Sequence, residues 1–339
     1  MGRSLEDLII FILKRFLQLL PVLLGVIVLT FLVTHVAAID PCPRWYQKAS
    51  LAVINHCKAQ FALPLWTQFW NYFTQLLSGN WGTSPLGVPV YPVISAAFPA
   101  TLELVLTSMF LMIFIGIPLG VIAAQFAGRW GDHLVRVLYL SGWSIPTYVG
   151  AIIAAVFLAP FLGLPTSGEY SAPPPFPQVT HMSVVDAIIA LNFPYTIDAL
   201  SHLILPAGVL AFIEMGNATR MTRSAMLEVL PLEYVKSARM KGLSNFVVLY
   251  KHALRNALIT ATTVLGVTAG GLLAGTVVIE EVFGWPGIGA YAFAVLGGGG
   301  RPDFDGAIAV VVVFAIGVVV ANLIADILYG VLDPRVEWR

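Results

Sequence analysis

Charged residues are scarce in this sequence. Only 11% of its 339 residues are Asp, Glu, Lys or Arg, whereas soluble proteins average about 25%. Hydrophobic residues make up 58% of the chain and the mean hydropathy is +0.86, values typical of a protein that lies in a bilayer. Because the formal net charge is zero, bulk charge gives no reason to expect a nucleic acid or an acidic partner.

The sequence also lacks the short motifs that carry common active sites. It has no G-x-x-x-x-G-K-S/T phosphate loop, no H-E-x-x-H zinc motif and no G-x-S-x-G nucleophile elbow. We therefore predict no catalytic residue, no metal ligand and no nucleotide site, and we expect that the protein is not an enzyme and binds no cofactor itself.

Cysteine is nearly absent, since Cys42 and Cys57 are the only two. Both lie in a segment that we expect outside the cell membrane, where an oxidising compartment permits a disulfide. Closing this short loop would stabilise the folded state by about 3 kcal/mol under the chain-entropy model. Two unpaired thiols are also consistent with the sequence, and two cysteines are too few for a cysteine-rich metal site.

Long apolar segments dominate what the sequence does contain. Six are long enough to cross the hydrocarbon core, which takes about 20 helical residues. They are residues 16–38, 99–125, 134–162, 201–222, 257–283 and 305–330. The first is too long for the hydrophobic region of a signal peptide, so we expect it to stay uncleaved. The sequence therefore predicts an all-α, polytopic membrane protein with six transmembrane helices.

Lys and Arg are distributed unequally between the two sides of these spans. Arg44, Lys48, Lys58 and Arg301 fall on one side, and the remaining fourteen of the eighteen fall on the other. Cytoplasmic loops carry an excess of Lys and Arg, so we expect both termini in the cytoplasm.

The outside segment between the first two spans, residues 39–98, is long enough for a small external subdomain. Apolar residues recur in it at helical spacing, which predicts an amphipathic helix on the membrane surface. This face contains Leu65, Phe69, Tyr72, Phe73 and Leu76. Of two further outside loops, "SAPPPFP" (171–177) is predicted to be extended rather than helical and "GGGGRPDFDG" (297–306) is predicted to be flexible. Each is either a plain connector or a contact for an external partner.

One inside segment, residues 223–256, carries recurring charge. Within it, "LEYVKSARMKGLSNF" (232–246) places Glu233 near one end of a short stretch and Arg239 near the other, shortly before Gly242. An acid in the first turn, a base in the last turn and a glycine just beyond match the dipole and capping preferences of helices. The pattern predicts a short helix.

The predicted helix has a narrow apolar stripe. Val235 and Ala238 form it together with Tyr234, and Ser237 is small enough to allow another surface to approach closely. Such a helix could lodge in a groove on another protein. A solvated loop helix without a special role fits the same residues.

Five polar or ionisable residues of the predicted spans are singled out: His35, Glu103, Glu214, Asn217 and Asp326. Charged groups at membrane depth are costly, so Glu103, Glu214, Asn217 and Asp326 are candidates for lining a translocation pathway. Placement at the interface, or a hydrogen bond between helices, explains them as well. The small number of such groups argues against a proton-coupled or sodium-coupled carrier.

Eight stretches occur in a fixed order along nearly the whole chain: "GNWGTS", "FPATLEL", "GIPLGVIAA", "SIPTYVGAI", "RMTRSAMLEVL", "EYVKSARMKGLSNFVVLYKHALRNALIT", "EEVFGWPGIG" and "LYGVLDPRV". Together they resemble the binding-protein-dependent ABC importer permeases of the peptide/nickel family, and within it the B-type transmembrane subunit. The longest stretch is similar to the family's cytoplasmic signature loop. Lys236 stands where the family pattern begins with an acid, and Thr260 stands where a proline is expected.

The resemblance implies an ABC type I importer permease fold and a division of the chain. Residues 1–97 would form the first transmembrane helix and the external subdomain, 98–330 the permease core with five transmembrane helices, and 331–339 a cytoplasmic tail. In the loop at about 223–256, a coupling helix would dock on a separate ATPase subunit. The residues expected to couple are Glu233, Tyr234, Lys236, Ser237, Ala238, Arg239, Lys241 and Gly242.

The same resemblance implies partners and a location. These are a homologous second permease, two ATPase subunits that bind ATP and Mg, an extracytoplasmic solute-binding protein, and the lipid of a prokaryotic inner membrane. The expected function is ATP-driven import of peptides or a related small solute, with nickel and oligosaccharides as further cargo classes. An ion-coupled secondary transporter and a structural membrane subunit are the alternatives.

Overall fold

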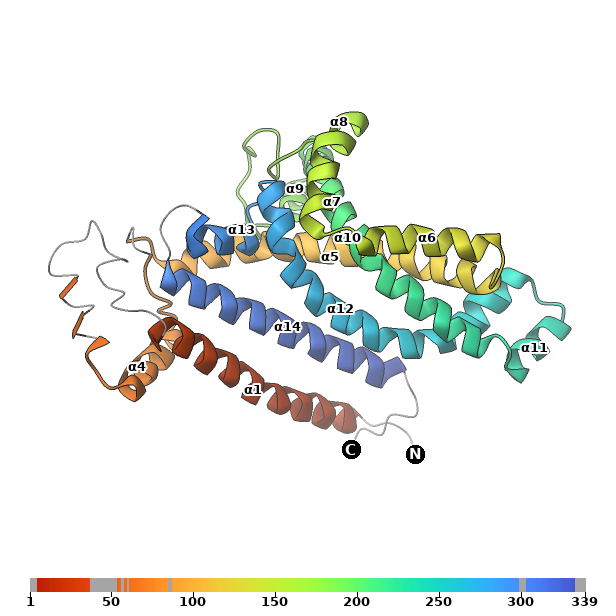
Figure 1. Cartoon of the computed structure of the whole chain (residues 1–339), viewed down its shortest axis with the longest axis horizontal. Helices are drawn as coiled ribbons and strands as arrows, with labels where there is room; N and C mark the ends of the chain where they lie inside the picture. Colours follow the sequence, from red (N-terminus) through yellow and green to blue (C-terminus); the bar gives the residue numbers. More distant parts are fainter. Residues whose placement is uncertain are drawn as a thin grey trace.

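The computed structural model describes residues 5–36, 54–55, 58–59, 61–84, 87–298 and 303–332. Within these ranges the chain forms helices, turns and loops, with one isolated bridge between Thr83 and Pro89 and no strand. The all-α prediction is confirmed. Long helices run beside one another along the long axis of the molecule (Figure 1).

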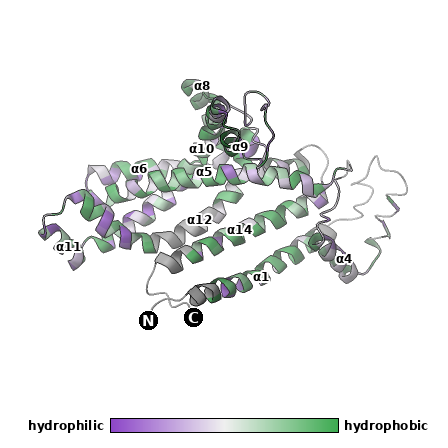
Figure 2. Ribbon diagram, turned by 180° about the vertical axis from the view of Figure 1, so that it is seen from behind, coloured by the Kyte–Doolittle hydropathy of each residue, from purple (hydrophilic) through white to green (hydrophobic). Residues whose placement is uncertain are grey.

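Five long helices form the body of the protein. They are α1 (Leu5–Val36), α5 (Val90–Gln125), α10 (Phe193–Val229), α12 (Leu254–Val282) and α14 (Phe304–Leu332). Each overlaps one of the predicted apolar segments. At 1.5 Å per residue even the shortest is about 44 Å long, which exceeds the roughly 30 Å of a hydrocarbon core. Hydrophobic residues dominate α1 and α14 in particular (Figure 2).

The third predicted span, residues 134–162, is not one helix. It consists of α6 (Trp130–Ser144), α7 (Thr147–Ile153), the π-helical turn η1 (Ala154–Leu158) and α8 (Ala159–Leu162). The chain bends by 102° between α6 and α7. Ile145 has an extended backbone there, because Pro146 disfavours helix at the residue before it and lacks an N–H donor. The segment is thus a bent series of helices, and α7 and α8 project from the bundle (Figure 1).

Four of the described helices, α1, α5, α10 and α14, are long and apolar enough to cross a membrane, and the bent α6–α8 segment would be a fifth. The helix α12 corresponds to the remaining predicted segment, so the count of six stays a prediction. The domain boundary predicted between residues 97 and 98 falls inside α5, which begins directly after Pro89 and continues through Pro99. The two predicted parts therefore share α5, and the division stays a prediction.

Shorter elements complete the fold. They are α4 (Leu65–Leu77), α9 (Ser183–Ile189), α11 (Glu233–Met240), the π-helical η2 (Val247–Ala253), α13 (Ile288–Phe293) and η3 (Ala294–Gly298). The helix predicted in the external segment is confirmed as α4, and residues 171–177 are non-helical as predicted. The helices α4 and α11 lie at opposite ends of the long axis (Figure 1).

The helix α10 is central to the bundle. Both α5 and α12 pack on it, α14 packs on α12, and α1 packs on α14. Two glycines of α5 allow the close approach to α10. A Cβ added at Gly120 would lie 2.6 Å from Cβ of Thr222 and 2.8 Å from the carbonyl oxygen of Thr219, and one at Gly116 would lie 3.1 Å from Cβ of Ala218. The two backbones therefore meet only because these positions have no side chain.

This close approach predicts that Gly120→Ala destabilises the protein. The added methyl overpacks the α5–α10 contact, which costs about 1–3 kcal/mol, and we expect a lower midpoint of thermal unfolding in detergent. Gly25→Ala on α1 is the matched control, because no atom lies within 4 Å of a Cβ added there. That control should leave the midpoint unchanged or raise it, since alanine favours helix by about 1 kcal/mol. Equal midpoints for the two variants would contradict the packing account.

Candidate coupling site

The connection between α10 and α12 contains the short helix that the sequence predicts. The helix α11 begins at Glu233 and ends at Met240, with Glu233 in its first turn and Arg239 in its last. Leu232 precedes it with an extended backbone, and Gly242 lies just beyond the C-cap with φ of +77°. Glycine adopts this left-handed conformation without the steric penalty of a Cβ. The predicted conformation and its ends are confirmed.

The apolar stripe of α11 is turned into this chain. Val235 is fully buried and Ala238 is 6% exposed. Both belong to an apolar cluster that also contains Val121 of α5, Met226 of α10 and Val248 of η2. The expectation that this stripe lodges in another protein is therefore wrong for Val235 and Ala238. The sequence shows that a stripe exists, but which surface covers it depends on how η2 folds back against α11.

Two polar contacts add to this packing. The side-chain amide of Asn256, on α12, donates a hydrogen bond of 2.7 Å to the hydroxyl of Tyr234. Within α11, Lys236 and Glu233 form an exposed ion pair with 2.9 Å between Nζ and Oε1. The Asn256 contact joins α11 to the helix that follows it, whereas the exposed ion pair contributes little, because such pairs are worth about 0–1 kcal/mol.

The outer side of this loop is available to a partner. Apart from Ala238, the other seven of the eight residues predicted for coupling are exposed. Three large apolar side chains that the prediction missed lie within or just after this set in the sequence: Met240 is 80% exposed, Leu243 40% and Phe246 70%. They recur every third residue in a segment that is otherwise polar, which is a signal that the sequence carries. Exposed apolar groups of this size are typical of binding surfaces.

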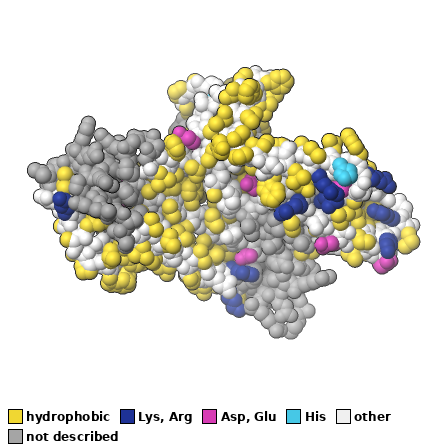
Figure 3. All heavy atoms as spheres, viewed as in Figure 1, with side chains coloured by type: hydrophobic (Ala, Val, Ile, Leu, Met, Phe, Trp, Pro, Cys, Tyr) yellow, Lys and Arg dark blue, Asp and Glu magenta, His cyan; other side chains and the backbone are white. Residues whose placement is uncertain are grey.

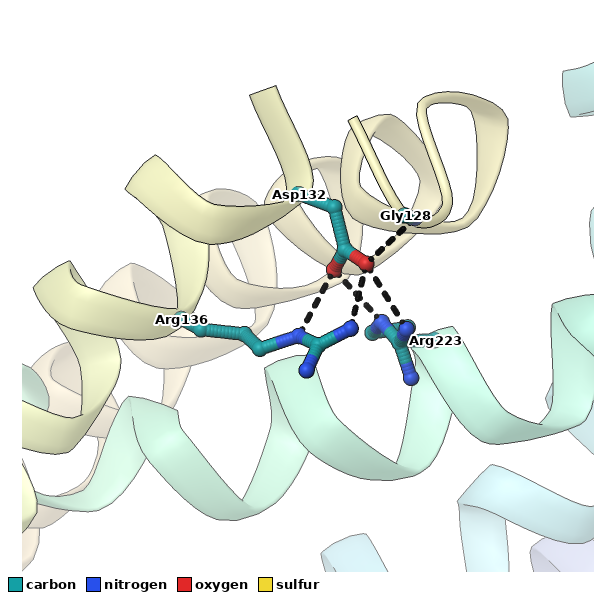
Figure 4. A network of polar contacts seen from close by, with 4 residues as sticks. All are labelled: Gly128, Asp132, Arg136 and Arg223. Atoms are coloured by element: carbon teal, nitrogen blue, oxygen red, sulfur yellow. Dashed lines mark hydrogen bonds and ion pairs between the residues drawn. The ribbon is translucent and has the colours of Figure 1, made fainter. Parts of the chain in front are cut away.

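A buried carboxylate lies where α6 meets α10. Asp132, in the first turn of α6, is 0% exposed and faces two arginines (Figure 4). Nε of Arg136 donates to its Oδ1 at 3.0 Å, and Nε and NH2 of Arg223, on α10, donate to Oδ1 and Oδ2 at 2.8 and 2.9 Å. The backbone N–H of Gly128 donates to Oδ2 at 3.0 Å. Each carboxylate oxygen thus accepts several hydrogen bonds.

This network ties α6 to the part of α10 that leads into the coupling loop. Arg223 lies within the last two helical turns of α10, which ends at Val229. Breaking a buried ion pair by removal of one partner costs about 3–5 kcal/mol, because the remaining charge is left uncompensated. The contact between Asp132 and Arg136 could be read from their i, i+4 spacing in "AGRWGDHLVR". The contact between Asp132 and Arg223, which are 91 residues apart, could not be predicted from their spacing in the sequence.

Glu103, one of the four residues predicted for the pathway, has a structural role. Its Oε2 accepts hydrogen bonds from the N–H (2.8 Å) and hydroxyl (2.9 Å) of Ser183, and its Oε1 accepts one from the N–H of Val184 (3.0 Å). These groups belong to the first turn of α9, whose N–H groups have no partner within the helix. Glu103 therefore caps α9 from α5 and is almost completely buried.

The remaining predicted polar residues are held apart from Glu103. The amide of Asn217 donates to Glu214 at 3.3 Å on α10, and both side chains are half-buried. Asp326 of α14 pairs with Arg15 of α1 at 3.5 Å. Among the described residues, no printed hydrogen bond or ion pair connects these groups to one another or to Glu103. Glu103, Glu214, Asn217 and Asp326 therefore do not form one site in the structure.

A second buried carboxylate, Glu280 at the end of α12, was missed in the sequence. It is 0% exposed. The hydroxyl of Thr101 donates to its Oε1 at 2.8 Å, and the N–H of Ala290 donates to its Oε2 at 3.1 Å. Its neighbour in the turn, Gly287, has no room for a side chain beside this carboxylate. Glu280 thus fixes the turn "GWPGIG" against α5.

Cys42 and Cys57 lie outside the described residues, so the predicted disulfide stays a prediction.

Comparison with models of protein families identifies the family of this chain. Residues 116–338 match the model of the binding-protein-dependent transport system inner membrane component. The chain belongs to this family. The permease is therefore a membrane subunit of a binding-protein-dependent importer, and the alternatives of an ion-coupled carrier and of a structural subunit are set aside. The matched region contains the loop of α11, the Asp132 network and Glu280.

Curated relatives match the permease over nearly its whole length. The probable D,D-dipeptide transport system permease protein DdpB of Escherichia coli is 39% identical, with 95% of this chain and 96% of that protein covered. The dipeptide transport system permease protein DppB of Alkalihalophilus pseudofirmus is 36% identical, with coverages of 96% and 98%. The oligopeptide transport system permease protein AppB of Bacillus subtilis is 35% identical, with coverages of 97% and 99%.

The fold has a solved counterpart. The permease is similar to a chain of the MetNI methionine ABC transporter in an inward-facing conformation, with a TM-score of 0.51 and 17% identity. The similarity covers 78% of the permease and 98% of that chain. The expected ABC importer permease fold is confirmed.

The Asp132 network predicts that two variants that each remove an ion pair differ in their free energy of unfolding. Asp132→Asn leaves Arg136 and Arg223 without a counter-charge. Because these side chains are 38% and 21% exposed and can be hydrated, we expect the free energy of unfolding to fall by about 1–3 kcal/mol, less than for a fully buried pair. Glu233→Gln removes the exposed pair with Lys236 and should change it by no more than about 0.5 kcal/mol. Thermal unfolding of the two purified variants in the same detergent measures the difference. A stability of Asp132→Asn equal to that of wild type would contradict a structural role for the network.

Proposed function

We propose that this permease forms the translocation pathway of an ATP-driven peptide importer together with a homologous second permease. Two ATPase subunits bind ATP and Mg on the cytoplasmic side, one of them docks on the loop of α11, and a solute-binding protein delivers cargo on the other side of the membrane. Residues 1–97 supply the first transmembrane helix and the external subdomain, residues 98–330 the core, and residues 331–339 a cytoplasmic tail.

One observation carries the docking role of α11. The helix buries Val235 and Ala238 in its own chain while its other face exposes Met240. A helix anchored in this way transmits force, because a push on the exposed face moves the buried face and the helices packed against it. The cluster beneath contains residues of α5, α10 and α12, so all three would respond.

The absence of a phosphate loop supports a separate ATPase. No G-x-x-x-x-G-K-S/T motif occurs in the sequence, so ATP would be hydrolysed on another chain. Lys and Arg gather over the end of the molecule where α11 lies (Figure 3). Because cytoplasmic loops carry an excess of these residues, this end would face the cytoplasm, and the distribution of Lys and Arg along the sequence places both termini on the same side. ATP binding on the partners would shift the permease between inward-open and outward-open populations.

Glu214 and Asn217 are the best candidates for lining the pathway. They lie near the middle of α10, are half-buried and contact each other rather than a capping group. Polar side chains at membrane depth usually face a helix bundle interior or a water-filled cavity. Glu103 caps α9 and Asp326 pairs with α1, so both already have structural roles.

Peptides are the cargo class that the relatives support. Proteins named for D,D-dipeptide, dipeptide and oligopeptide transport are 35–39% identical to the permease. We expect proteoliposomes that hold the complete complex to take up labelled dipeptides when ATP is supplied on the ATPase side. Uptake of nickel or an oligosaccharide without uptake of peptide would contradict this cargo class.

The docking surface gives a direct mutational prediction. Met240→Gln replaces the most exposed apolar side chain of the α11 loop, so we expect at least about a tenfold weaker association with the ATPase subunits, equivalent to about 1.4 kcal/mol. Co-purification of the ATPase subunits with the tagged permease measures the association. The membrane insertion and thermal stability of the variant should be unchanged, because this side chain is 80% exposed.

The matched control is Trp130→Gln. Trp130 is 77% exposed and begins α6, at the same end of the molecule, but it is not part of the α11 loop. It should leave ATPase association unchanged. Normal association of Met240→Gln would contradict the docking assignment, and equal loss in both variants would show that docking is not specific to the α11 loop. A test at Ala238 would be weaker, because that side chain is buried and its replacement disturbs the loop itself.

A further inference from the structure

The helix α4, at the end of the molecule opposite α11, exposes two large aromatic side chains. Trp66 is 71% exposed and Trp70 is 53% exposed, and their rings stack with centroids 6.3 Å apart. The sequence of α4, "LWTQFWNYFTQLL", contains no Asp, Glu, Lys or Arg. A helix that keeps tryptophans on its surface and has no charge is unusual in water and requires an explanation from its surroundings.

One face of α4 packs on the transmembrane helix α1. Phe69 and Tyr72 both contact Phe31 of α1, with ring centroids at 5.3 and 6.0 Å. Phe69 and Tyr72 are half-buried, and no described residue of α4 is fully buried. The face that the sequence analysis expected to lie on the membrane therefore lies in part on the protein. Leu65, which was assigned to that face, is exposed instead.

The exposed tryptophans form a stripe beside this contact face. Successive residues of a helix are turned by about 100°, so Trp66, Trp70 and Leu77 share a direction next to that of Phe69. The polar residues of α4 lie on the opposite side, at Thr67, Asn71, Thr74 and Gln75. The helix thus has three sides: one against α1, one apolar and exposed, and one polar.

The contact with α1 sets the depth of α4 relative to a membrane. The part of α1 that is apolar enough to cross a membrane is Ile12–Val33, and only 11% of its most apolar window is buried in this chain, so most of it is open to lipid. Phe31 lies two residues before the end of this part. The helix α4 lies at that end of α1 and at an angle to it (Figure 1). Its level is therefore the edge of the hydrocarbon core, where tryptophan is enriched in membrane proteins.

We propose that α4 is an interfacial membrane anchor, in which Trp66, Trp70 and Leu77 insert into the outer-leaflet boundary between headgroups and acyl chains. The exposed apolar stripe continues the lipid-facing surface of α1, and the polar side faces water. Because α4 has no cationic side chain, its binding does not depend on anionic headgroups. The anchor holds the external segment at a fixed height above the pathway, and this role does not rest on the identity of the cargo.

Fluorescence quenching by brominated phosphatidylcholine tests the proposal on the full-length permease in nanodiscs. The signal of Trp66 and Trp70 is the difference between wild type and the double variant Trp66→Phe/Trp70→Phe, which keeps aromatic side chains at both positions. We expect lipid brominated near the headgroup to quench this difference at least about twofold more than aqueous acrylamide or lipid brominated at the bilayer centre does. Addition of anionic phosphatidylglycerol should leave the quenching unchanged.

Asn71→Trp in the double-variant background is the matched control. This position lies on the polar side of the same helix, so its tryptophan should be quenched by acrylamide and not by brominated lipid. Quenching of Trp66 and Trp70 by acrylamide alone would overturn the proposal. So would protection of these residues only when a soluble solute-binding protein is added, because that result would assign the stripe to a protein partner. Dependence on phosphatidylglycerol would also contradict an uncharged anchor.

Discussion

The carboxylate of Asp132 is the constraint on which the α11 end of this permease depends. It is fully buried and is held between guanidinium groups from its own helix and from α10. A buried charge is tolerated only when it is paired and its remaining lone pairs accept hydrogen bonds. Arg136, Arg223 and the N–H of Gly128 meet that condition. As a result α6 cannot move away from the last turns of α10 without exposing or orphaning a charge.

The coupling loop continues from this fixed point. The helix α10 runs from the Asp132 network into the loop, and α11 returns to the bundle by burying Val235 and Ala238 against α5, α10 and η2. The close contact of α5 and α10 at Gly120 joins the same unit from the other side. The ion pair, the apolar cluster and the glycine contact together join α11 and the neighbouring ends of α5, α6 and α10 into one packed unit. A rigid unit of this kind suits the proposed transfer of motion from an ATPase, because packed interfaces change between discrete arrangements and do not deform gradually.

Patterns of residues close together in the sequence were sufficient to predict where many of the helices lie. Apolar length located α1, α5, α10, α12 and α14, and the order of Glu233, Arg239 and Gly242 located α11 with its ends. These features depend on residues close together in the chain. Hydropathy did not reveal the bend at Pro146, because the apolar composition continues on both sides of it while the backbone changes direction. The dipeptide Ile145–Pro146 was the available signal.

Long-range contacts could not be predicted in the same way. Asp132 meets Arg223 across 91 residues, Glu103 meets Ser183 across 80, and Glu280 meets Thr101 across 179. Each pair depends on which helices become neighbours, and single-residue patterns do not contain that information. For the same reason the sequence identified the apolar stripe of α11 but not the side that it faces. The spacing of Met240, Leu243 and Phe246 is visible in the sequence, but their exposure is set by the burial of Val235 and Ala238 on the other side of the loop.

The central claim is that the exposed face of α11 touches a separate ATPase, and photo-crosslinking tests this contact most directly. A photoreactive phenylalanine analogue at position 240 should form a covalent adduct with the ATPase subunit in membranes that contain the complete complex. The same analogue at position 70, on α4, should form none with that subunit. An adduct at position 240 with lipid or the second permease alone, and none with the ATPase, would contradict the account.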